Sequence, residues 1–187
     1  MSPFDAVLPA PSSSPPTPSP ALSGGETSCA TILAAPGFCL GIRCSEDEIT
    51  EIVYLEPCAE IKPKSLLAKE AVRQLSAYLT DPAFDFSLPL APAGTPFQRR
   101  VWQGITAISP GETRTYGELA NSLHSGPRAV GNACGANPYP LVVPCHRVVA
   151  AHGGSNGGLG GFARSRGGFL LDVKRWLLAH EAFARGR

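Results

Sequence analysis

Residues 137–149, Asn-Pro-Tyr-Pro-Leu-Val-Val-Pro-Cys-His-Arg-Val-Val, form the most informative stretch of the chain. The apolar run at residues 141–143 indicates a buried strand or another hydrophobic approach to a core. Pro144 ends that run, because proline has a fixed φ and no amide hydrogen to donate. Cys145 comes next, followed directly by His146 and Arg147. Since a neighbouring imidazole and guanidinium lower the pKa of a thiol, the sequence predicts that Cys145 is a nucleophile.

Composition and cysteine usage narrow the class of protein. The chain has 187 residues, enough for one or two small domains with a buried core. No apolar run approaches the roughly 20 residues of a membrane span, and the first residues lack the features of a secretory signal. Six cysteines at irregular spacing, without Cys-x-x-Cys pairs, argue against a disulfide scaffold and a zinc ribbon. We therefore expect reduced thiols, with Cys29, Cys39, Cys44 and Cys58 as small buried hydrophobes.

Charge is distributed unevenly along the chain, although the net charge is only +1. Residues 1–93 carry 5 basic and 11 acidic residues, which gives −6. Residues 94–187 carry 11 basic and 4 acidic residues, which gives +7. This polarity indicates that the C-terminal half meets a polyanion.

The residue pattern predicts a disordered tail followed by a small α/β domain. Residues 1–24 are dominated by Pro, Ser and Ala, a composition that cannot bury a core. Apolar runs at residues 30–35, 38–44 and 49–55, separated by turn signals, predict three strands. Helical periodicity over residues 65–79 predicts an amphipathic helix. We assign these elements to a domain over residues 25–90.

Helix-start signals predict a mainly helical second domain over residues 91–187. Thr95-Pro-Phe-Gln98 and Thr115-Tyr-Gly-Glu118 are capping boxes, and Arg128 begins a third helix that ends near Ala136. Two short helices across a tight turn that contains glycine predict a helix-turn-helix. The expected fold class is therefore α+β.

Several of these motifs together resemble the O6-alkylguanine-DNA alkyltransferases. The resemblance begins with Pro-Cys-His-Arg-Val at residues 144–148 and with Asn137-Pro138. It extends through four further segments: Gly-Thr-Pro-Phe-Gln at 94–98, Gly-Glu-Thr-Arg-Thr-Tyr-Gly-Glu-Leu-Ala at 111–120, Arg-Ala-Val-Gly at 128–131 and Lys-Arg-Trp-Leu-Leu-Ala-His-Glu at 174–181. About half the chain, from Gly94 onward, carries it. It implies a ribonuclease-H-like topology without catalytic residues for the N-terminal domain, and a DNA-binding alkyltransferase domain after it.

The resemblance also implies a reaction. Cys145 attacks the alkyl group on guanine O6, or less efficiently on thymine O4, after the damaged nucleotide has been flipped out of duplex DNA. His146 is then the base that acts on Cys145 through a water, and Glu181 orients His146. Tyr116 donates to the leaving guanine, and Asn137 ties the recognition helix to the Cys145 segment. The thioether product is stable, so each molecule acts once, and this chemistry needs neither a cofactor nor a metal.

The placement of Glu181 supports its role independently of the resemblance. Val173, Leu177 and Glu181 are four residues apart, so the carboxylate falls on the apolar stripe of the last helix. A buried carboxylate needs a partner, which His146 would supply. The alternative is a surface glutamate whose stem lies along the protein while its head reaches water.

The third predicted helix is rich in small residues, including Ala129 and Gly131. Such residues favour tight helix–helix packing, but they also allow a helix to approach DNA closely. The resemblance implies the second role, with Arg128 inserted where the target base has left the stack, a task that suits a planar and always charged guanidinium. Arg147 is grouped with these DNA-binding residues. The turn between Tyr116 and Arg128 is shorter than in many members of the family.

A glycine-rich loop separates Cys145 from the last helix. Residues 153–168 contain eight glycines in sixteen positions, which by itself indicates a flexible surface loop. The resemblance implies an active-site lid, in which we include four loop residues and one residue of the last helix: Gly161, Phe162, Gly167, Gly168 and Lys174. Arg164 and Arg166 are candidates for phosphate contacts.

Three other functions remain as alternatives. A cysteine hydrolase would use Cys145, His146 and Asn137, but it leaves the helix-turn-helix unexplained. A module that recognises damaged guanine without repairing it would not need the cysteine. A zinc deaminase would need a histidine–cysteine cluster that the spacing does not provide. We expect a monomer that acts on double-stranded DNA containing O6-alkylguanine, in a bacterial cytoplasm or a nucleus.

Overall fold

Three strands near the start of the computed structural model form an antiparallel sheet in the order β1-β2-β3, comprising β1 (Thr31–Ala35), β2 (Phe38–Cys44) and β3 (Ile49–Leu55). The model describes residues 30–151, 158–163 and 167–185, with side chains up to residue 182. The N-terminal tail and Cys29 lie outside the described residues. The three predicted strands are therefore confirmed to within one residue at each end.

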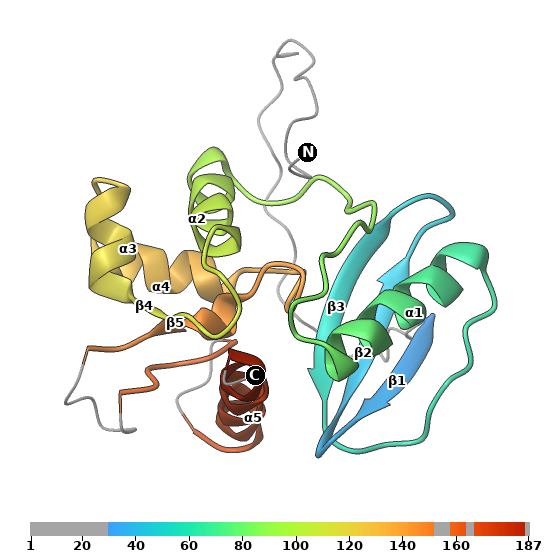
Figure 1. Cartoon of the computed structure of the whole chain (residues 1–187). Coiled ribbons are helices and arrows are strands. Elements are labelled where there is room, and N and C mark those ends of the chain that lie inside the picture. Colours follow the sequence, from blue (N-terminus) through green and yellow to red (C-terminus); the bar gives the residue numbers. More distant parts are fainter. Residues whose placement is uncertain (1–29, 152–157, 164–166, 186–187) are drawn as a thin grey trace, which may run out of the picture.

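Helix α1 (Leu66–Thr80) packs on one face of this sheet (Figure 1). It begins where Ser65 accepts a hydrogen bond from the amide of Ala68, which satisfies one of the free donors of the first turn. Its inward face includes Ala71, Leu75 and Tyr78, all of them buried. The predicted amphipathic helix is confirmed, and it carries a tyrosine toward the second half of the molecule.

The second half of the chain is mainly helical, as predicted. It contains α2 (Pro96–Thr106), β4 (Arg114–Thr115), α3 (Tyr116–Ser122), α4 (Pro127–Gly135), the 3₁₀ turn η1 (Cys145–Arg147), β5 (Val148–Val149) and α5 (Phe169–Arg185). Both capping boxes form, with Thr95 bonded to Gln98 at the start of α2 and Thr115 to Glu118 at the start of α3. Strands β4 and β5 pair in parallel. This pairing places the start of α3 beside the segment that follows Cys145.

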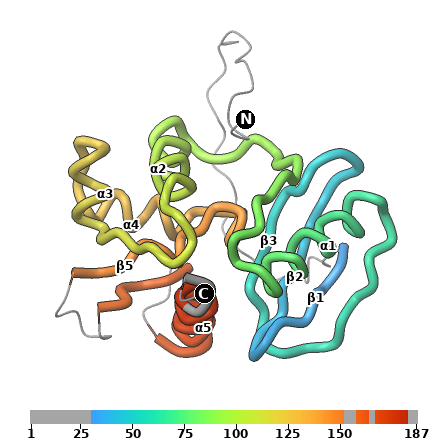
Figure 2. The backbone as a smooth tube through the Cα atoms, in the orientation of Figure 1, coloured from blue at the N-terminus to red at the C-terminus, as the bar shows by residue number. Residues whose placement is uncertain are grey.

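The two halves share one hydrophobic core. Figures 1 and 2 show the sheet and α1 on one side, helices α2 to α4 on the other, and α5 near the junction. The ring of Phe38 in β2 lies 5.4 Å from the ring of Trp176 in α5. The amide of Ile52 in β3 donates to the carbonyl of Pro138 at 2.8 Å. Apolar residues of both halves belong to the same buried cluster, so the position of the sheet is fixed relative to the Cys145 segment.

Two details predicted from the sequence need correction. Of the two alternatives for residues 141–143, the strand is wrong and the hydrophobic approach to the core is confirmed: Leu141 and Val143 are buried and Val142 is half-buried, but Leu141 has a φ of 74° and the amide of Val143 donates back to the carbonyl of Tyr139, which makes a turn. Cys58 is exposed, and Cys44 is only half-buried, so of the four cysteines expected in the core the described part of the chain buries Cys39 alone.

Two kinds of feature are absent from the described residues. None of their helices is long and apolar enough to cross a membrane. Nor do their histidine, cysteine and acidic side chains gather into a group of three or more that could hold a metal ion.

Candidate active site

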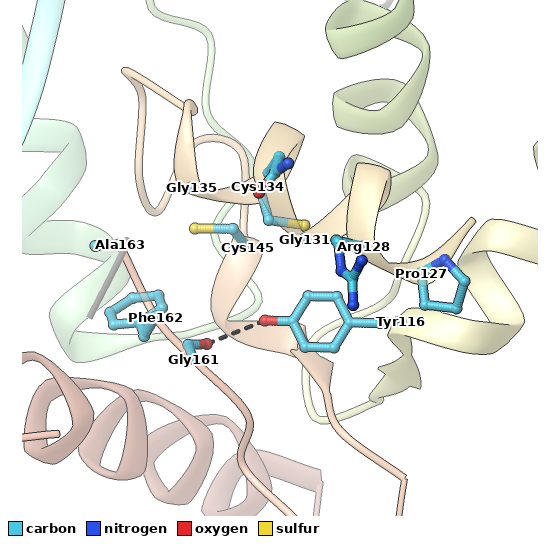
Figure 3. A pocket seen from close by; sticks show the side chains of 11 residues that line it. Tyr116, Pro127, Arg128, Gly131, Cys134, Gly135, Cys145, Gly161, Phe162 and Ala163 are labelled. Atoms are coloured by element: carbon cyan, nitrogen blue, oxygen red, sulfur yellow. Dashed lines mark hydrogen bonds between the residues drawn. The ribbon is translucent and has the colours of Figure 1, made fainter. Parts of the chain in front are cut away.

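Cys145 lies at the start of the 3₁₀ turn η1, directly after Pro144. Its amide donates to the carbonyl of Val143 at 2.8 Å, which tightens the chain around the cysteine. The residue is only 6% exposed, and what remains accessible faces a cavity of about 630 Å³ (Figure 3). A reagent can therefore reach the thiol only through that cavity.

Three segments wall the cavity around Cys145. They are one side of α4, the tyrosine that begins α3, and residues 161–163 of the glycine-rich loop. The lining residues are Tyr116, Pro127, Arg128, Gly131, Asn132, Cys134, Gly135, Cys145, Gly161, Phe162 and Ala163. The structure thus brings the predicted nucleophile, the predicted recognition helix and part of the predicted lid to one cavity.

Opposing effects act on the Cys145 thiol. Burial raises its pKa, while a hydrogen bond from Asn137 and the charge of Lys174 lower it. Asn137 is itself fixed, because its amide nitrogen donates to the carbonyl of Val143 at 2.9 Å and its side-chain oxygen accepts from the amide of Tyr139 at 2.9 Å. Asn137 follows the end of α4 and therefore links that helix to the segment before Cys145.

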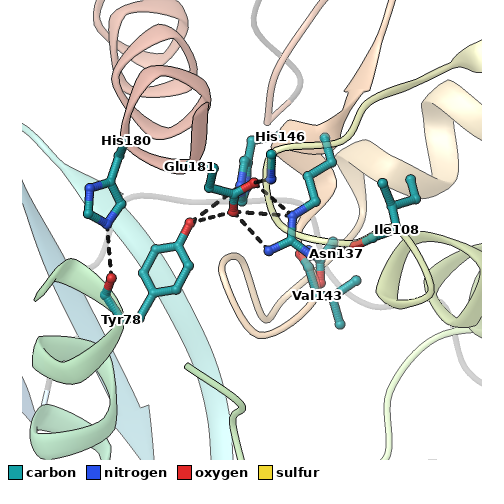
Figure 4. A network of polar contacts seen from close by, with 9 residues as sticks. Tyr78, Ile108, Asn137, Val143, His146, His180 and Glu181 are labelled. Carbon is teal, nitrogen blue, oxygen red and sulfur yellow. Dashed lines mark hydrogen bonds and ion pairs between the residues drawn. The ribbon is translucent and has the colours of Figure 1, made fainter. Parts of the chain in front are cut away.

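Behind Cys145 lies a buried polar group that we call the Glu181 cluster, consisting of Tyr78, His146, Arg147 and Glu181 (Figure 4). Oε1 of Glu181 accepts from His146 Nε2 at 2.8 Å, from the Tyr78 hydroxyl at 2.8 Å and from Arg147 Nη2 at 2.8 Å. Oε2 accepts from Arg147 Nε at 3.0 Å and from the amide of Gly111 at 3.1 Å. The carboxylate is 1% exposed, so the alternative of a surface glutamate is wrong.

These hydrogen bonds, together with burial, determine the protonation states of Glu181 and His146. Burial alone would raise the pKa of Glu181, but hydrogen bonds from His146 and Arg147 hold that pKa well below its usual range. Burial lowers the pKa of His146, and Glu181 only partly offsets this. With an ionised acceptor at Nε2, the neutral ring carries its proton there and leaves the lone pair on Nδ1. Nδ1 is buried and has no hydrogen-bond partner within the described structure, so it is the nitrogen available as a base.

Arg147 does not occupy the surface position expected of a DNA-binding residue. Its guanidinium is 7% exposed, pairs with Glu181, and donates through Nη1 to the carbonyl of Ile108. The physical reason is the 3₁₀ turn, in which successive side chains point about 120° apart, so that neighbours of a cavity-facing cysteine turn into the core. The structure therefore corrects the sequence-based assignment of Arg147.

Lys174 anchors the described part of the glycine-rich loop. Its side chain is fully buried, and Nζ donates to the carbonyls of Val148 at 2.7 Å, Leu159 at 2.7 Å and Gly161 at 3.2 Å. Burial lowers the pKa of Lys174 to about 8, although the nearby cysteines act to raise it. Nζ also lies 5.9 Å from the centre of the Tyr116 ring and 5.7 Å from that of Phe162. Lys174 thus connects the backbone of the glycine-rich loop with the two aromatic rings, Tyr116 and Phe162, that line the cavity.

Tyr116 is a second side chain that binds the backbone of the glycine-rich loop. Its hydroxyl donates to the carbonyl of Gly161 at 3.0 Å (Figure 3), and burial raises the pKa of the phenol, which keeps it a donor. The neighbouring Gly160 has a φ of 69°, and a Cβ there would lie 2.9 Å from the Tyr116 ring. Only glycine fits this close approach without strain.

The remaining predicted residues are placed as follows. Arg128 is exposed at the start of α4 and lines the cavity, while Ala129 and Gly131 are half-buried beside it. Gly167 and Gly168 stand at the beginning of α5 and are absent from the cavity lining found among the described residues, and the Gly168 carbonyl accepts from the amide of Leu171. Arg164 and Arg166 lie outside the described residues.

Sequence reasoning missed three residues of the site. Tyr78 belongs to the half of the chain for which no site residue was expected, yet it contacts Glu181. Cys134 puts a second thiol in the cavity, and burial raises its pKa to about 12. Gly160 was one glycine among eight, and only a contact with Tyr116 distinguishes it.

Comparisons with known proteins agree with this geometry. Residues 96–183 match the family model described as 6-O-methylguanine DNA methyltransferase, DNA binding domain. The methylated-DNA–protein-cysteine methyltransferase of Methanosarcina acetivorans is 45% identical over 115 residues, which cover 60% of this chain and 68% of that protein. A constitutive enzyme of the same name from Bacillus subtilis is 43% identical over 111 residues, covering 57% and 65%.

Solved structures agree as well. The crystal structure of Mycobacterium tuberculosis OGT in complex with DNA superimposes with a TM-score of 0.66 at 34% identity, covering 82% of this chain and 92% of that one. The resemblance inferred from the sequence is thereby confirmed. This chain belongs to the methylated-DNA–protein-cysteine methyltransferase family.

Proposed function

We propose that this protein repairs DNA by moving the alkyl group of O6-alkylguanine, and less efficiently that of O4-alkylthymine, onto its own Cys145 in a single turnover. The observation that carries the proposal is the position of Cys145, which lines a cavity open to solvent and has the His146–Glu181 pair directly behind it. Cys145, His146 and Glu181 all lie within residues 96–183, the range that matches the family model.

The proposed chemistry begins with the proton of Cys145. His146 accepts it at Nδ1 through a water, because residues adjacent in a 3₁₀ turn do not face one another. The thiolate then attacks the alkyl carbon, so that a sulfur–carbon bond forms while the carbon–O6 bond breaks and its electron pair passes to guanine. Tyr116 exchanges its bond to Gly161 for one to the leaving base and supplies a proton or hydrogen bond to it. Because the thioether is stable, Cys145 is not regenerated, and no cofactor takes part.

We propose further that α3, the turn after it and α4 form a helix-turn-helix that docks on duplex DNA. The exposed guanidinium of Arg128 lies at the mouth of the cavity, where it is placed to fill the gap left by a flipped nucleotide. Ala129 and Gly131 leave the helix backbone close to its DNA-facing side. The excess of basic residues after residue 94 supplies attraction to phosphates.

The two halves are, in this proposal, a ribonuclease-H-like domain at residues 25–90 and an alkyltransferase domain at 91–187. Gly161, Phe162 and Lys174 form the working part of the lid, while Gly167 and Gly168 allow the chain to turn into α5. The protein acts as a monomer on DNA in a bacterial cytoplasm or a nucleus.

One experiment tests the reaction, the nucleophile and the stoichiometry together. Intact protein is incubated with duplex DNA that contains one O6-methylguanine, and mass spectrometry with peptide mapping follows. We expect one added methyl group per molecule, on the peptide that contains Cys145, and none in Cys145→Ala, which still binds the DNA. Tight binding of the lesion with no change in mass would indicate a damage-recognition module instead.

A second experiment separates base flipping from the alkyl-transfer step. Arg128→Ala should slow repair of duplex DNA far more than it slows reaction with free O6-benzylguanine, because the free base needs no flipping. Equal losses on both substrates would contradict the role proposed for Arg128.

A further inference from the structure

We propose that Tyr78, in helix α1, is a positioning residue for alkyl transfer: its hydroxyl fixes the Glu181 carboxylate and, through it, the proton-accepting face of His146. The inference rests on the proposed function and extends it to the N-terminal half of the chain, for which no part in the reaction was expected.

The contact is direct and enclosed. The Tyr78 hydroxyl donates to Oε1 of Glu181 at 2.8 Å, between residues 103 positions apart in the sequence (Figure 4). Tyr78 is 1% exposed. Its ring packs 5.6 Å from that of Phe86 and 5.7 Å from that of His180, centre to centre. His180 Nε2 also lies 2.9 Å from the carbonyl oxygen of Tyr78, which ties α1 to α5 one residue before Glu181. The hydroxyl is thus held in place by both helices.

Tyr78 and His146 share the same carboxylate oxygen. His146 Nε2 lies 2.8 Å from Oε1 of Glu181, whereas it lies 3.5 Å from the Tyr78 hydroxyl. The phenol and the imidazole are therefore neighbouring donors to one acceptor, and the contact between them is much longer than either bond to Oε1. The terminal torsion of a glutamate has a broad energy profile, so the direction in which Oε1 points depends on its donors. The Gly111 amide holds the other oxygen, Oε2, and among the described donors to Oε1 Tyr78 is the one that lies outside η1.

That direction determines which nitrogen of His146 is free. As long as Oε1 accepts from Nε2, the lone pair of the neutral ring is on Nδ1, the atom that has no partner in the described structure. A carboxylate that rotates away from Nε2 would no longer select this tautomer. Through its bond to Glu181, Tyr78 lets the N-terminal half of the chain influence the reaction without contacting the substrate.

The charged groups around His146 give the expected direction of a pH effect. Glu181 stabilises the charged imidazole, whereas Arg147 and Lys174 disfavour it. Tyr78 remains neutral, since burial raises the pKa of its phenol. Removing the hydroxyl lets Oε1 turn away from Nε2, which weakens the hydrogen bond and the charge interaction by which Glu181 favours the imidazolium, and so lowers the pKa of the imidazole further.

The test compares Tyr78→Phe with Tyr139→Phe in the full-length protein. Tyr139 is a matched control: it is 2% exposed, and its hydroxyl donates to the carbonyl of Ala91 and not to Glu181. Single-turnover rates are measured against pH with methylated duplex and with free O6-benzylguanine. We expect Tyr78→Phe to lower both rates by the same factor, roughly tenfold, which is the lower end of the usual worth of a hydrogen bond to a charged group. The acid limb of the Tyr78→Phe rate profile should move to lower pH, while Tyr139→Phe keeps the wild-type limb.

A readout independent of activity accompanies the rates. Nitrogen-15 NMR of the histidine rings reports the tautomer and the pKa of His146 in the wild type and both variants. We expect the proton on Nε2 in the wild type, and a lowered pKa with a mixture of tautomers in Tyr78→Phe alone. An unchanged tautomer and pKa in Tyr78→Phe would overturn the inference, as would equal changes in Tyr139→Phe. A wild-type protein that transfers no alkyl group would refute the proposed function, and the NMR comparison would still decide the role of Tyr78.

Discussion

The Glu181 cluster and the lid lie on two sides of the same thiol, and they are held in different ways. In the cluster, charged and neutral side chains converge on one buried carboxylate, and every partner comes from a helix, a 3₁₀ turn or a tight turn. In the lid, the side chains of Tyr116 and Lys174 bind backbone carbonyls of residues 159 and 161. A carbonyl can exchange one donor for another, whereas a buried carboxylate cannot lose its partners without a large cost.

This difference matches the tasks of the two regions. A base that must point at one atom benefits from a fixed environment that does not reorganise during the reaction. A cavity that must admit a nucleobase benefits from contacts that the substrate can replace. Substitutions in the cluster should therefore affect stability and chemistry together, and substitutions in the lid should affect them separately.

Glu181→Gln should have the largest effect. It leaves the Arg147 guanidinium buried without a counter-charge, which costs about 3–5 kcal/mol of unfolding free energy. It also removes the partner that orients His146, so transfer should fall more than in Tyr78→Phe. Because the folded pKa of Glu181 is depressed, its contribution to stability is present above the ordinary carboxyl range and is lost as pH falls below it. Denaturant unfolding at several pH values measures both effects.

The exposed pair of Glu70 and Arg73 provides the control for Glu181. Glu70 accepts from Arg73 one turn away on α1, and both side chains are largely in solvent. Glu70→Gln should therefore leave the unfolding free energy nearly unchanged, because solvent screens an exposed ion pair. If Glu181→Gln and Glu70→Gln lower the unfolding free energy equally, the Glu181 cluster is not held more firmly than an exposed ion pair.

Lys174→Met should have an intermediate effect that depends on pH. The folded pKa of about 8 lies below the ordinary value of 10.5, so the unfolded chain binds more protons between these values. Wild-type stability therefore gains from Lys174 as pH rises through that window, by up to about 3 kcal/mol. Lys174→Met lacks this gain, so the difference in unfolding free energy between the two proteins should change with pH from 8 to 10.5.

Transfer measurements complete the comparison for Lys174. Without the ammonium, the carbonyls of residues 148, 159 and 161 lose a shared donor, and the rate with both substrates should fall at neutral pH. A difference in stability that is flat across the window would show that Lys174 titrates normally and that the lid is not anchored by a desolvated charge.

The local pattern of the sequence predicted the elements well, because strands, capping boxes and helix stripes depend on near neighbours. Thr95 and Thr115 begin helices where their side chains can bond the third residue on. Glu181 was placed correctly on the inner face of α5 because helical spacing alone puts it there. The shared core explains why the same reasoning fails for Tyr78, whose partner is 103 residues away and belongs to another element.

The predicted DNA-binding role of Arg147 and the predicted strand at residues 141–143 failed for a related reason. Their conformations depend on two tight turns, one before Pro144 and one after it. Neither composition nor periodicity encodes the direction of side chains in such turns. An arginine next to a nucleophile in a basic half of the chain suggested DNA, but the turn directs it to Glu181. An apolar triplet suggested a strand, but Leu141 takes a left-handed conformation and the chain folds back.

Gly160→Ala should have the smallest effect and the most local one. A Cβ at this position would lie 2.9 Å from the Tyr116 ring and 3.2 Å from the amide nitrogen of Ala150, and the φ of 69° disfavours any side chain. Backbone strain of this kind costs on the order of 1–3 kcal/mol. Because the clash pushes on Tyr116, the substitution should also weaken the bond between its hydroxyl and Gly161, and so change the rate with free O6-benzylguanine.

Gly168→Ala is the matched control for Gly160→Ala, since Gly168 has the same positive φ, 68°, but a Cβ there would meet no described atom within 4 Å. Both are glycines of the same predicted lid with the same backbone conformation, so they differ in contact with Tyr116 and not in strain. If both alanines slow the reaction equally, the loop acts through its general freedom of movement. If only Gly160→Ala does so, the lid acts through one close contact between its backbone and the tyrosine that begins α3, which places the sensitive point of this region at a single residue.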